Sequence, residues 1–407
     1  MRSLQLFDLE RANILTGHSW AEKNLEGDSS AAIDLCKSYP DAGAYVLDLR
    51  LSPCEKIPWL ETALEACTRS NDRAAEGSHL GNLGRAYFDL GDPRKAIEFC
   101  EKALDISREI GHLLGEGTDL GNLGNAYSNL GDPRKAIEFY EQALAIFREI
   151  GYRRGEGNSL GALGNAYSDL GDPRKAIDFY EQALAIAREI GDRQGEGNHL
   201  NNLGLACINL GDPRKAIDFC ERALAIAREI GDRRNEGADL GNLGLAYYHL
   251  GDPRKAIDFY EQALAIAREI GDLRREGNSL GALGNAYSDL GDPRKAIDFY
   301  GKALAIAREI GYRRGEGNSL GALGNAYSDL GDPRKAIEYH EEAHAISREI
   351  GDRGGEGADL FNMSLSLHSL GQNEEAVSLA RSALAIYEEI ESPSAEIVRK
   401  ALAEWSG

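Results

Sequence analysis

The segment GDPRKA occurs seven times in this chain of 407 residues, always 40 residues apart, with its glycine at positions 91, 131, 171, 211, 251, 291 and 331. A degraded eighth copy, GQNEEA, begins at Gly371. Self-similarity at a fixed period of this length indicates stacked units that bury their apolar faces only against their neighbours. The period therefore favours one long repeat array over two or three unrelated globular domains.

The composition restricts these units to helices. The chain has only three valines, at 46, 377 and 398, and four threonines, at 16, 62, 68 and 118. Strands draw on β-branched residues, so a substantial sheet is excluded. A hydrophobic content of 42% is ordinary for a folded protein. We therefore expect an all-α fold.

Each unit has the pattern of a helical hairpin, as the segment 153–191 illustrates. Two apolar stripes recur there at helical spacing: Leu160, Leu163, Gly164, Tyr167 and Leu170, then Ala176, Ile177, Tyr180, Ala183, Leu184 and Ala187. Between them, Gly171 can end the first helix, Asp172 can cap the second, and Pro173 fits its first turn.

The motif Leu160-x2-Leu163-Gly164-x2-Tyr167, followed by Ala176-x3-Tyr180 and Ala183, resembles the tetratricopeptide repeat (TPR) consensus. The 40-residue unit is longer than the usual ~34 residues, and resembles the units of Pins-type spindle-orientation adaptors and of many bacterial arrays. The resemblance implies a right-handed superhelical solenoid of about eight hairpins, whose first helices line a concave groove.

Three parts are expected along the chain. Residues 1–72 form an N-terminal helical cap whose segment 31–72 is a degenerate hairpin, with its first helix broken at Pro40. Residues 73–390 hold eight TPR units. Residues 391–407 form a capping helix with an apolar face of Val398, Ala401, Leu402 and Trp405. The stretch at 39–66 also resembles the lead-in to TPR sensor arrays of bacterial STAND NTPases, although this sequence contains no GxxxxGK[ST] motif.

Charge and motif content exclude several classes of function. A net charge of -21 disfavours nucleic acid, no apolar run is long enough to cross a bilayer, and the first residues lack the apolar core of a signal peptide. The six cysteines have no metal-ligand spacing, and we interpret them as small buried hydrophobes in a reducing cytoplasm.

One catalytic pattern is present, because residues 340–344 read His-Glu-Glu-Ala-His and match HExxH. However, His340 and His344 occupy the packed positions of Tyr180 and Leu184 in the repeat. We therefore predict no zinc, no other cofactor and no enzymatic activity; an enzyme would need a bound metal.

The exposed face of the first helices is rich in asparagine, which is a poor helix former on a solvated surface. An asparagine ladder can offer a donor and an acceptor to each amide of an extended peptide. Alternatively, recently copied repeats have simply copied their asparagines. On the ligand hypothesis, alanine at these positions would hardly affect folding. The predicted binding residues of the ladder are Asn122, Asn125, Asn158, Asn165, Asn202, Asn242, Asn285 and Asn325.

Apolar residues interrupt the ladder at its centre. Leu205 and Leu245 replace asparagine there, beside Ile208 and Tyr248. We predict that Leu205, Leu245 and Tyr248 belong to an apolar anchor for a ligand. The alternative is that the two leucines pack between adjacent units.

Together these features predict a non-enzymatic, cytoplasmic scaffold that holds a protein or an extended peptide in its groove and binds neither nucleic acid nor membrane. Self-association is left open. The alternative is a ligand-sensing C-terminal segment of a STAND-type NTPase signalling switch.

Overall fold

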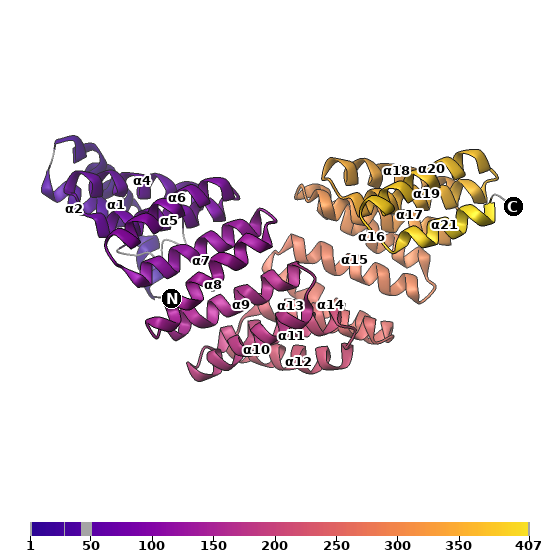
Figure 1. Cartoon of the computed structure of the whole chain (residues 1–407), viewed down its shortest axis with the longest axis horizontal. Helices are drawn as coiled ribbons and strands as arrows, with labels where there is room; N and C mark the ends of the chain where they lie inside the picture. The colour runs from indigo at the N-terminus through magenta and orange to yellow at the C-terminus, as the bar shows by residue number, and fades with distance from the viewer. Residues whose placement is uncertain (1, 28, 42–50, 406–407) are drawn as a thin grey trace. The chain divides into compact units, whose positions relative to one another are not determined.

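Helices make up all the regular structure of the part of the chain that the computed structural model describes, namely residues 2–27, 29–41 and 51–405. Figure 1 shows them as successive hairpins. The predicted all-α fold of repeated helical hairpins is confirmed for these residues. The chain divides into two compact units, residues 1–206 and residues 207–407, and the boundary falls within helix α11 (Arg193–Asn209).

The first unit begins with helices that precede the regular repeats. They are α1 (Arg2–Asn24), the 3-10 helix η1 (Leu25–Gly27), α2 (Ser30–Asp41) and α4 (Pro53–Ser70). Three regular hairpins follow: α5 (Arg73–Asp89) with α6 (Pro93–Glu109), α7 (Leu113–Asn129) with α8 (Pro133–Glu149), and α9 (Arg153–Asp169) with α10 (Pro173–Glu189). Within this unit the first helices α5, α7 and α9 contact one another in sequence.

The second unit contains the end of α11 and then α12 (Pro213–Ile230). Its hairpins are α13 (Arg233–His249) with α14 (Pro253–Ile270), α15 (Leu273–Asp289) with α16 (Pro293–Glu309), α17 (Arg313–Asp329) with α18 (Pro333–Glu349), and α19 (Arg353–Ser369) with α20 (Asn373–Glu389). Helix α21 (Ser394–Trp405) packs on α20 through the buried Val398. The predicted division at residues 72 and 390 stays a prediction.

The turn between α9 and α10 follows the predicted capping chemistry, whereas α20 begins after Gln372 without a side-chain cap. Gly171 has a φ of 75°, a left-handed conformation that favours glycine. Asp172 then caps α10, because its carboxylate accepts a hydrogen bond from the backbone N–H of Lys175 at 3.1 Å. Next to the turn, Tyr167 stacks on Phe179 with ring centres 5.3 Å apart, and the Lys175 ammonium lies 4.8 Å from the centre of the Tyr167 ring.

Close packing inside a hairpin depends on a glycine in the first helix. A Cβ atom at Gly164 would lie 2.4 Å from the ring of Tyr180, which is too close for any side chain. The same relation holds between Gly124 and Tyr140, and between Gly284 and Tyr300. The recurring spacing of glycine and tyrosine in these hairpins is therefore a packing requirement.

Adjacent hairpins are joined by a buried glutamate between two arginines. Glu156 of α9 accepts a hydrogen bond from Arg148 of α8 at 2.9 Å and another from Arg153, which also contacts Glu189. Equivalent Arg–Glu–Arg clusters surround Glu196, Glu236 and Glu316. Burial alone would raise the pKa of Glu196, but hydrogen bonds from its two arginines outweigh burial and lower it.

Several sequence predictions need correction. The predicted apolar stripe includes Leu170, yet this residue is 40% exposed, because it is the C-cap residue that follows the last turn of α9. Cys54 is exposed, unlike the other five cysteines. Helix α2 continues through Pro40 to Asp41, and residues 42–50 of the predicted STAND-like stretch lie outside the described residues. Among the described helices, none has the length and apolar content needed to cross a bilayer.

Candidate functional site

In the part of the chain that the structure describes, clefts open between the first helices of adjacent hairpins, among them the following three. One lies in the first unit between α5 and α7 and has a volume of about 260 Å³. Two lie in the second unit, between α13 and α15 with about 250 Å³, and between α15 and α17 with about 320 Å³. Glycines of the first helices line all three, so missing side chains create the space. We call the side of each unit that carries these helices the first-helix face.

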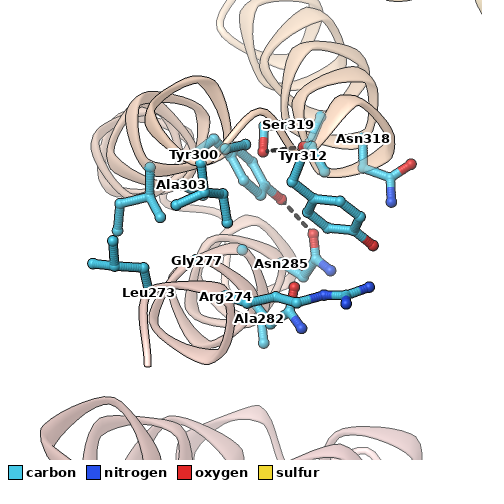
Figure 2. A pocket seen from close by; sticks show the side chains of 17 residues that line it. Leu273, Arg274, Gly277, Ala282, Asn285, Tyr300, Ala303, Tyr312, Asn318 and Ser319 are labelled. Atoms are coloured by element: carbon cyan, nitrogen blue, oxygen red, sulfur yellow. Dashed lines mark hydrogen bonds between the residues drawn. The ribbon is translucent and has the colours of Figure 1, made fainter. Parts of the chain in front are cut away.

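The largest cleft combines a cation, an aromatic ring and amides (Figure 2). The guanidinium of Arg274 lies 4.6 Å from the centre of the Tyr312 ring, which contributes a cation–π contact across two hairpins. Asn278, Asn285 and Asn318 all line the cleft and are exposed. Such a surface can bind polar groups and peptide amides, and it offers an arginine to an anionic group.

The structure brings some of the predicted binding residues to these clefts. Asn122 lines the cleft of the first unit, Asn242 and Leu245 line the smaller cleft of the second unit, and Asn285 lines the largest. Among the described residues, the remaining predicted ones do not line any of these three clefts: Asn125, Asn158, Asn165, Asn202, Leu205, Asn325 and Tyr248.

The predicted apolar anchor is divided between the two units. Leu205 belongs to the first unit and is partly buried. Leu245 and Tyr248, both in the second unit, are partly buried as well, whereas Ile208 is buried. Burial and a hydrogen bond with Asp289 raise the pKa of Tyr248 to about 12, so its hydroxyl is a neutral group at physiological pH. The anchor itself stays a prediction.

Sequence reasoning missed Arg274 and Tyr312 as a pair. Their signal lies in differences between repeats: the position of Tyr312 is occupied by aspartate at 192, 232, 272 and 352. Those aspartates cap their helices, as Asp272 does for the backbone N–H of Arg275. Tyr312 is the N-cap residue of α17 but makes no capping hydrogen bond with its side chain, and its ring lines the cleft instead.

The asparagine ladder has a structural role that was not predicted. The side-chain oxygens of Asn125, Asn165 and Asn285 accept hydrogen bonds from the hydroxyls of Tyr140, Tyr180 and Tyr300 at 2.8, 2.7 and 2.7 Å. These tyrosines are buried, and burial raises the pKa of each hydroxyl. The pairing is not strict across the repeats, because Tyr260 has Leu245 at the equivalent position and His340 has Asn325. These three asparagines nevertheless satisfy buried hydroxyls within their own hairpins.

This contact changes the expectation that alanine is tolerated in the ladder. We expect Asn165→Ala to lower the free energy of unfolding by about 1–2 kcal/mol, because it leaves the buried Tyr180 hydroxyl without its acceptor. Tyr180→Phe should lower the free energy of unfolding by less than Asn165→Ala does. The double variant should lower it by less than the sum of the two single variants. Urea unfolding of the four proteins measures the coupling. Strictly additive effects would contradict a structural role for this pair.

The two histidines of the HExxH pattern lie on the packed side of their helix. His340 is buried, with its Nδ1 atom 3.5 Å from Oδ1 of Asp359, and its ring lies against Gly324. His344 is partly buried. Within the described residues, no group of three or more histidine, cysteine, aspartate or glutamate side chains is placed to hold a metal ion. The absence of zinc stays a prediction.

Comparisons with solved structures reveal the same fold at low sequence identity. A signal transduction ATPase of the STAND class with a tetratricopeptide repeat sensor, from Pyrococcus horikoshii, is similar with a TM-score of 0.65 and 19% identity; the match covers 93% of this chain and 55% of that one. The quorum sensor NprR from B. thuringiensis is similar with a TM-score of 0.62 and 16% identity, and the match covers 85% of this chain and 99% of NprR. A Rap protein complexed with Competence and Sporulation Factor is similar with a TM-score of 0.53 and 15% identity, and the match covers 81% of this chain and 97% of the Rap protein.

Sequence comparison identifies the family. No curated protein matches this sequence significantly. A family model described as tetratricopeptide repeat matches residues 57–109, 117–189, 196–269, 263–309, 275–349 and 315–389, and a second model of the same description matches residues 162–229. These matches span most of the chain and coincide with the helical hairpins. The chain therefore belongs to the tetratricopeptide repeat family.

Proposed function

We propose that this protein is a non-catalytic scaffold that binds a protein segment or an extended peptide along its first-helix face. The observation that carries the proposal is the cleft between α15 and α17. It is lined by the exposed amides of Asn278 and Asn318 and by Arg274, which lies over the Tyr312 ring. The family and the fold of its structural relatives support a role in protein interaction.

The chemistry of the cleft suits a peptide backbone. Each asparagine side chain can donate to a carbonyl group and accept from an N–H group, so one amide can bind both polar groups of a peptide unit. Asn285 differs, because its oxygen already accepts from Tyr300. We therefore assign backbone recognition to Asn278 and Asn318, and we assign a supporting role to Asn285.

The test uses the full chain and a display library of short random peptides. We expect wild-type protein to select binders, and the double variant Asn278→Ala with Asn318→Ala to bind them roughly thirtyfold more weakly, at about 1 kcal/mol for each lost hydrogen bond. Gln262→Ala, on the exposed side of α14, is the matched control and should bind as wild type does. Failure to select any binder would contradict the proposal. Full affinity in the double variant would place the binding site elsewhere.

A sensor of a STAND-type switch is the second candidate. The similarity to the Pyrococcus horikoshii protein favours it, because that protein carries a tetratricopeptide repeat sensor. An upstream reading frame that encodes a nucleotide-binding P-loop in the same polypeptide would support this candidate. Both candidates use the first-helix face to bind a ligand, and they differ in what binding controls.

A further inference from the structure

The cleft of the first unit has a buried carboxylate at its base. Asp119 of α7 is only 5% exposed, and its Oδ2 atom accepts a hydrogen bond from the hydroxyl of Ser107 at 2.8 Å. Its Oδ1 atom faces Gly81 of α5, where a Cβ atom would lie 3.0 Å away. Because Gly81 has no side chain, Oδ1 of Asp119 is directed into the cleft that both residues line.

The second unit contains the same arrangement with one addition. Asp359 accepts a hydrogen bond from Ser347 at 3.1 Å, and its Oδ1 atom lies 3.5 Å from Nδ1 of His340. The position equivalent to His340 in the first unit is Cys100. Burial raises the pKa of the Cys100 thiol to about 12, so Cys100 is neutral and gives Asp119 no positive partner.

The environment of Asp119 leaves its charge poorly compensated. Burial raises the pKa of Asp119 to about 6; the hydrogen bond from Ser107 opposes this rise, and the nearby Glu116 adds to it. The carboxylate is therefore mostly ionised at neutral pH. The residues that line the cleft include His112 but no lysine or arginine. A buried carboxylate is stabilised most by a cation that enters from the cleft.

The walls of the cleft suit an amphipathic cation. Ile110 and Leu114 line it and are exposed, so they can pack along an aliphatic chain. Asn82, Thr118 and Asn122 surround the cleft with oxygen atoms that can accept further hydrogen bonds. A lysine side chain has both parts, an apolar stem and a compact ammonium with three donors. Oδ2 of Asp119 already accepts from Ser107, so the two-oxygen pairing that favours arginine is disfavoured here.

We propose that Asp119 recognises a lysine side chain of the bound segment, whose ammonium group enters the cleft between α5 and α7 and contacts Oδ1. This inference rests on the proposed binding of a protein segment or peptide to the first-helix face. It also fits the net charge of -21, which favours basic partners. The cleft in Figure 2 differs, because it carries the cationic side chain of Arg274.

The first experiment uses a small probe and the full chain. Nα-acetyl-lysine methylamide is titrated into protein labelled with ¹³C at the aspartate carboxyl carbons, and the Asp119 signal is identified by its loss in Asp119→Asn. We expect the probe to shift this signal, and the Nε-acetylated form of the probe to leave it unchanged. An absent shift, or an equal response to both probes, overturns the proposal. Stronger binding of a free amine such as spermidine would also overturn it, because the site would then not be specific for a peptide lysine.

The second experiment compares peptides selected by wild-type protein, by Asp119→Asn and by the matched control Asp359→Asn. We expect lysine to be enriched with wild type and with Asp359→Asn, and lysine-containing binders to lose about tenfold in affinity for Asp119→Asn. Equal lysine content and affinity for Asp119→Asn would overturn the inference and leave the scaffold intact. If the small probe binds while no peptide does, the proposed function fails and lysine recognition in a bound segment fails with it. Melting curves confirm that both variants are folded.

Discussion

Alanine in place of Gly164 is expected to lower the free energy of unfolding by about 2–3 kcal/mol, although alanine is the better helix former. The new Cβ atom would lie 2.4 Å from the ring of Tyr180, which is itself only 3% exposed. The ring has no free space to move into, so α9 and α10 must separate. Urea unfolding followed by circular dichroism measures the loss, and hydrogen exchange should localise it to these two helices.

Gly121 in α7 provides the matched control. A Cβ atom at Gly121 would have no heavy atom within 4 Å, although Gly121, like Gly164, lies inside a first helix of the first compact unit. Gly121→Ala should therefore raise the free energy of unfolding by about 0.5–1 kcal/mol through helix propensity alone. If both variants were stabilised, the close approach of Tyr180 to Gly164 would not be a feature of the folded protein.

Replacing Asp239 with asparagine should stabilise the protein increasingly as the pH rises. Asp239 is 2% exposed, and burial raises the pKa of its carboxyl group to about 8; repulsion from Asp232 adds to this rise, and Arg275 opposes it. In the unfolded chain an aspartate ionises near pH ~3.9. Between these values the folded protein holds a proton that the unfolded chain has released, so wild-type stability falls as the pH rises.

The expected size of this effect is large. One pKa unit corresponds to about 1.4 kcal/mol, so the stability difference between Asp239→Asn and wild type should grow by several kcal/mol between about pH 4 and pH 9. Urea unfolding across this range measures it. Asp119→Asn is the graded control, because the pKa of Asp119 is raised only to about 6, and its smaller gain should level off near that pH. Parallel stability curves for wild type and Asp239→Asn would contradict the prediction.

The repeat period and the turn chemistry allowed the hairpins to be predicted in detail. Gly171, Asp172 and Pro173 act on the backbone within a few residues of themselves, so their effect does not depend on distant contacts. Leu170 shows the limit of this reasoning. It continues the helical spacing of the stripe, but α9 ends at Asp169 and Leu170 is its C-cap residue, and periodicity alone cannot reveal where a helix ends.

The candidate site was less predictable for a related reason. Asn122, Asn242 and Asn285 line the clefts, and their role in binding stays a prediction. However, the hydrogen bond between Asn165 and Tyr180 joins two helices across a turn, and neither residue signals it alone. The clefts depend on glycines opposite residues of the next hairpin, as Gly81 is opposite Asp119. These pairings are tertiary, and one sequence contains them only as differences between its own repeats.

The Arg–Glu–Arg clusters have a consequence for how such an array can change in length. Each cluster takes one arginine from the end of a hairpin and a glutamate and an arginine from the start of the next, at positions that recur every 40 residues. An in-frame duplication or deletion of one such unit therefore recreates a complete cluster at the new junction, with no buried glutamate left unpaired. Gain or loss of whole repeats can thus lengthen or shorten the array while keeping these junctions intact, and selection can act on the number of clefts that result.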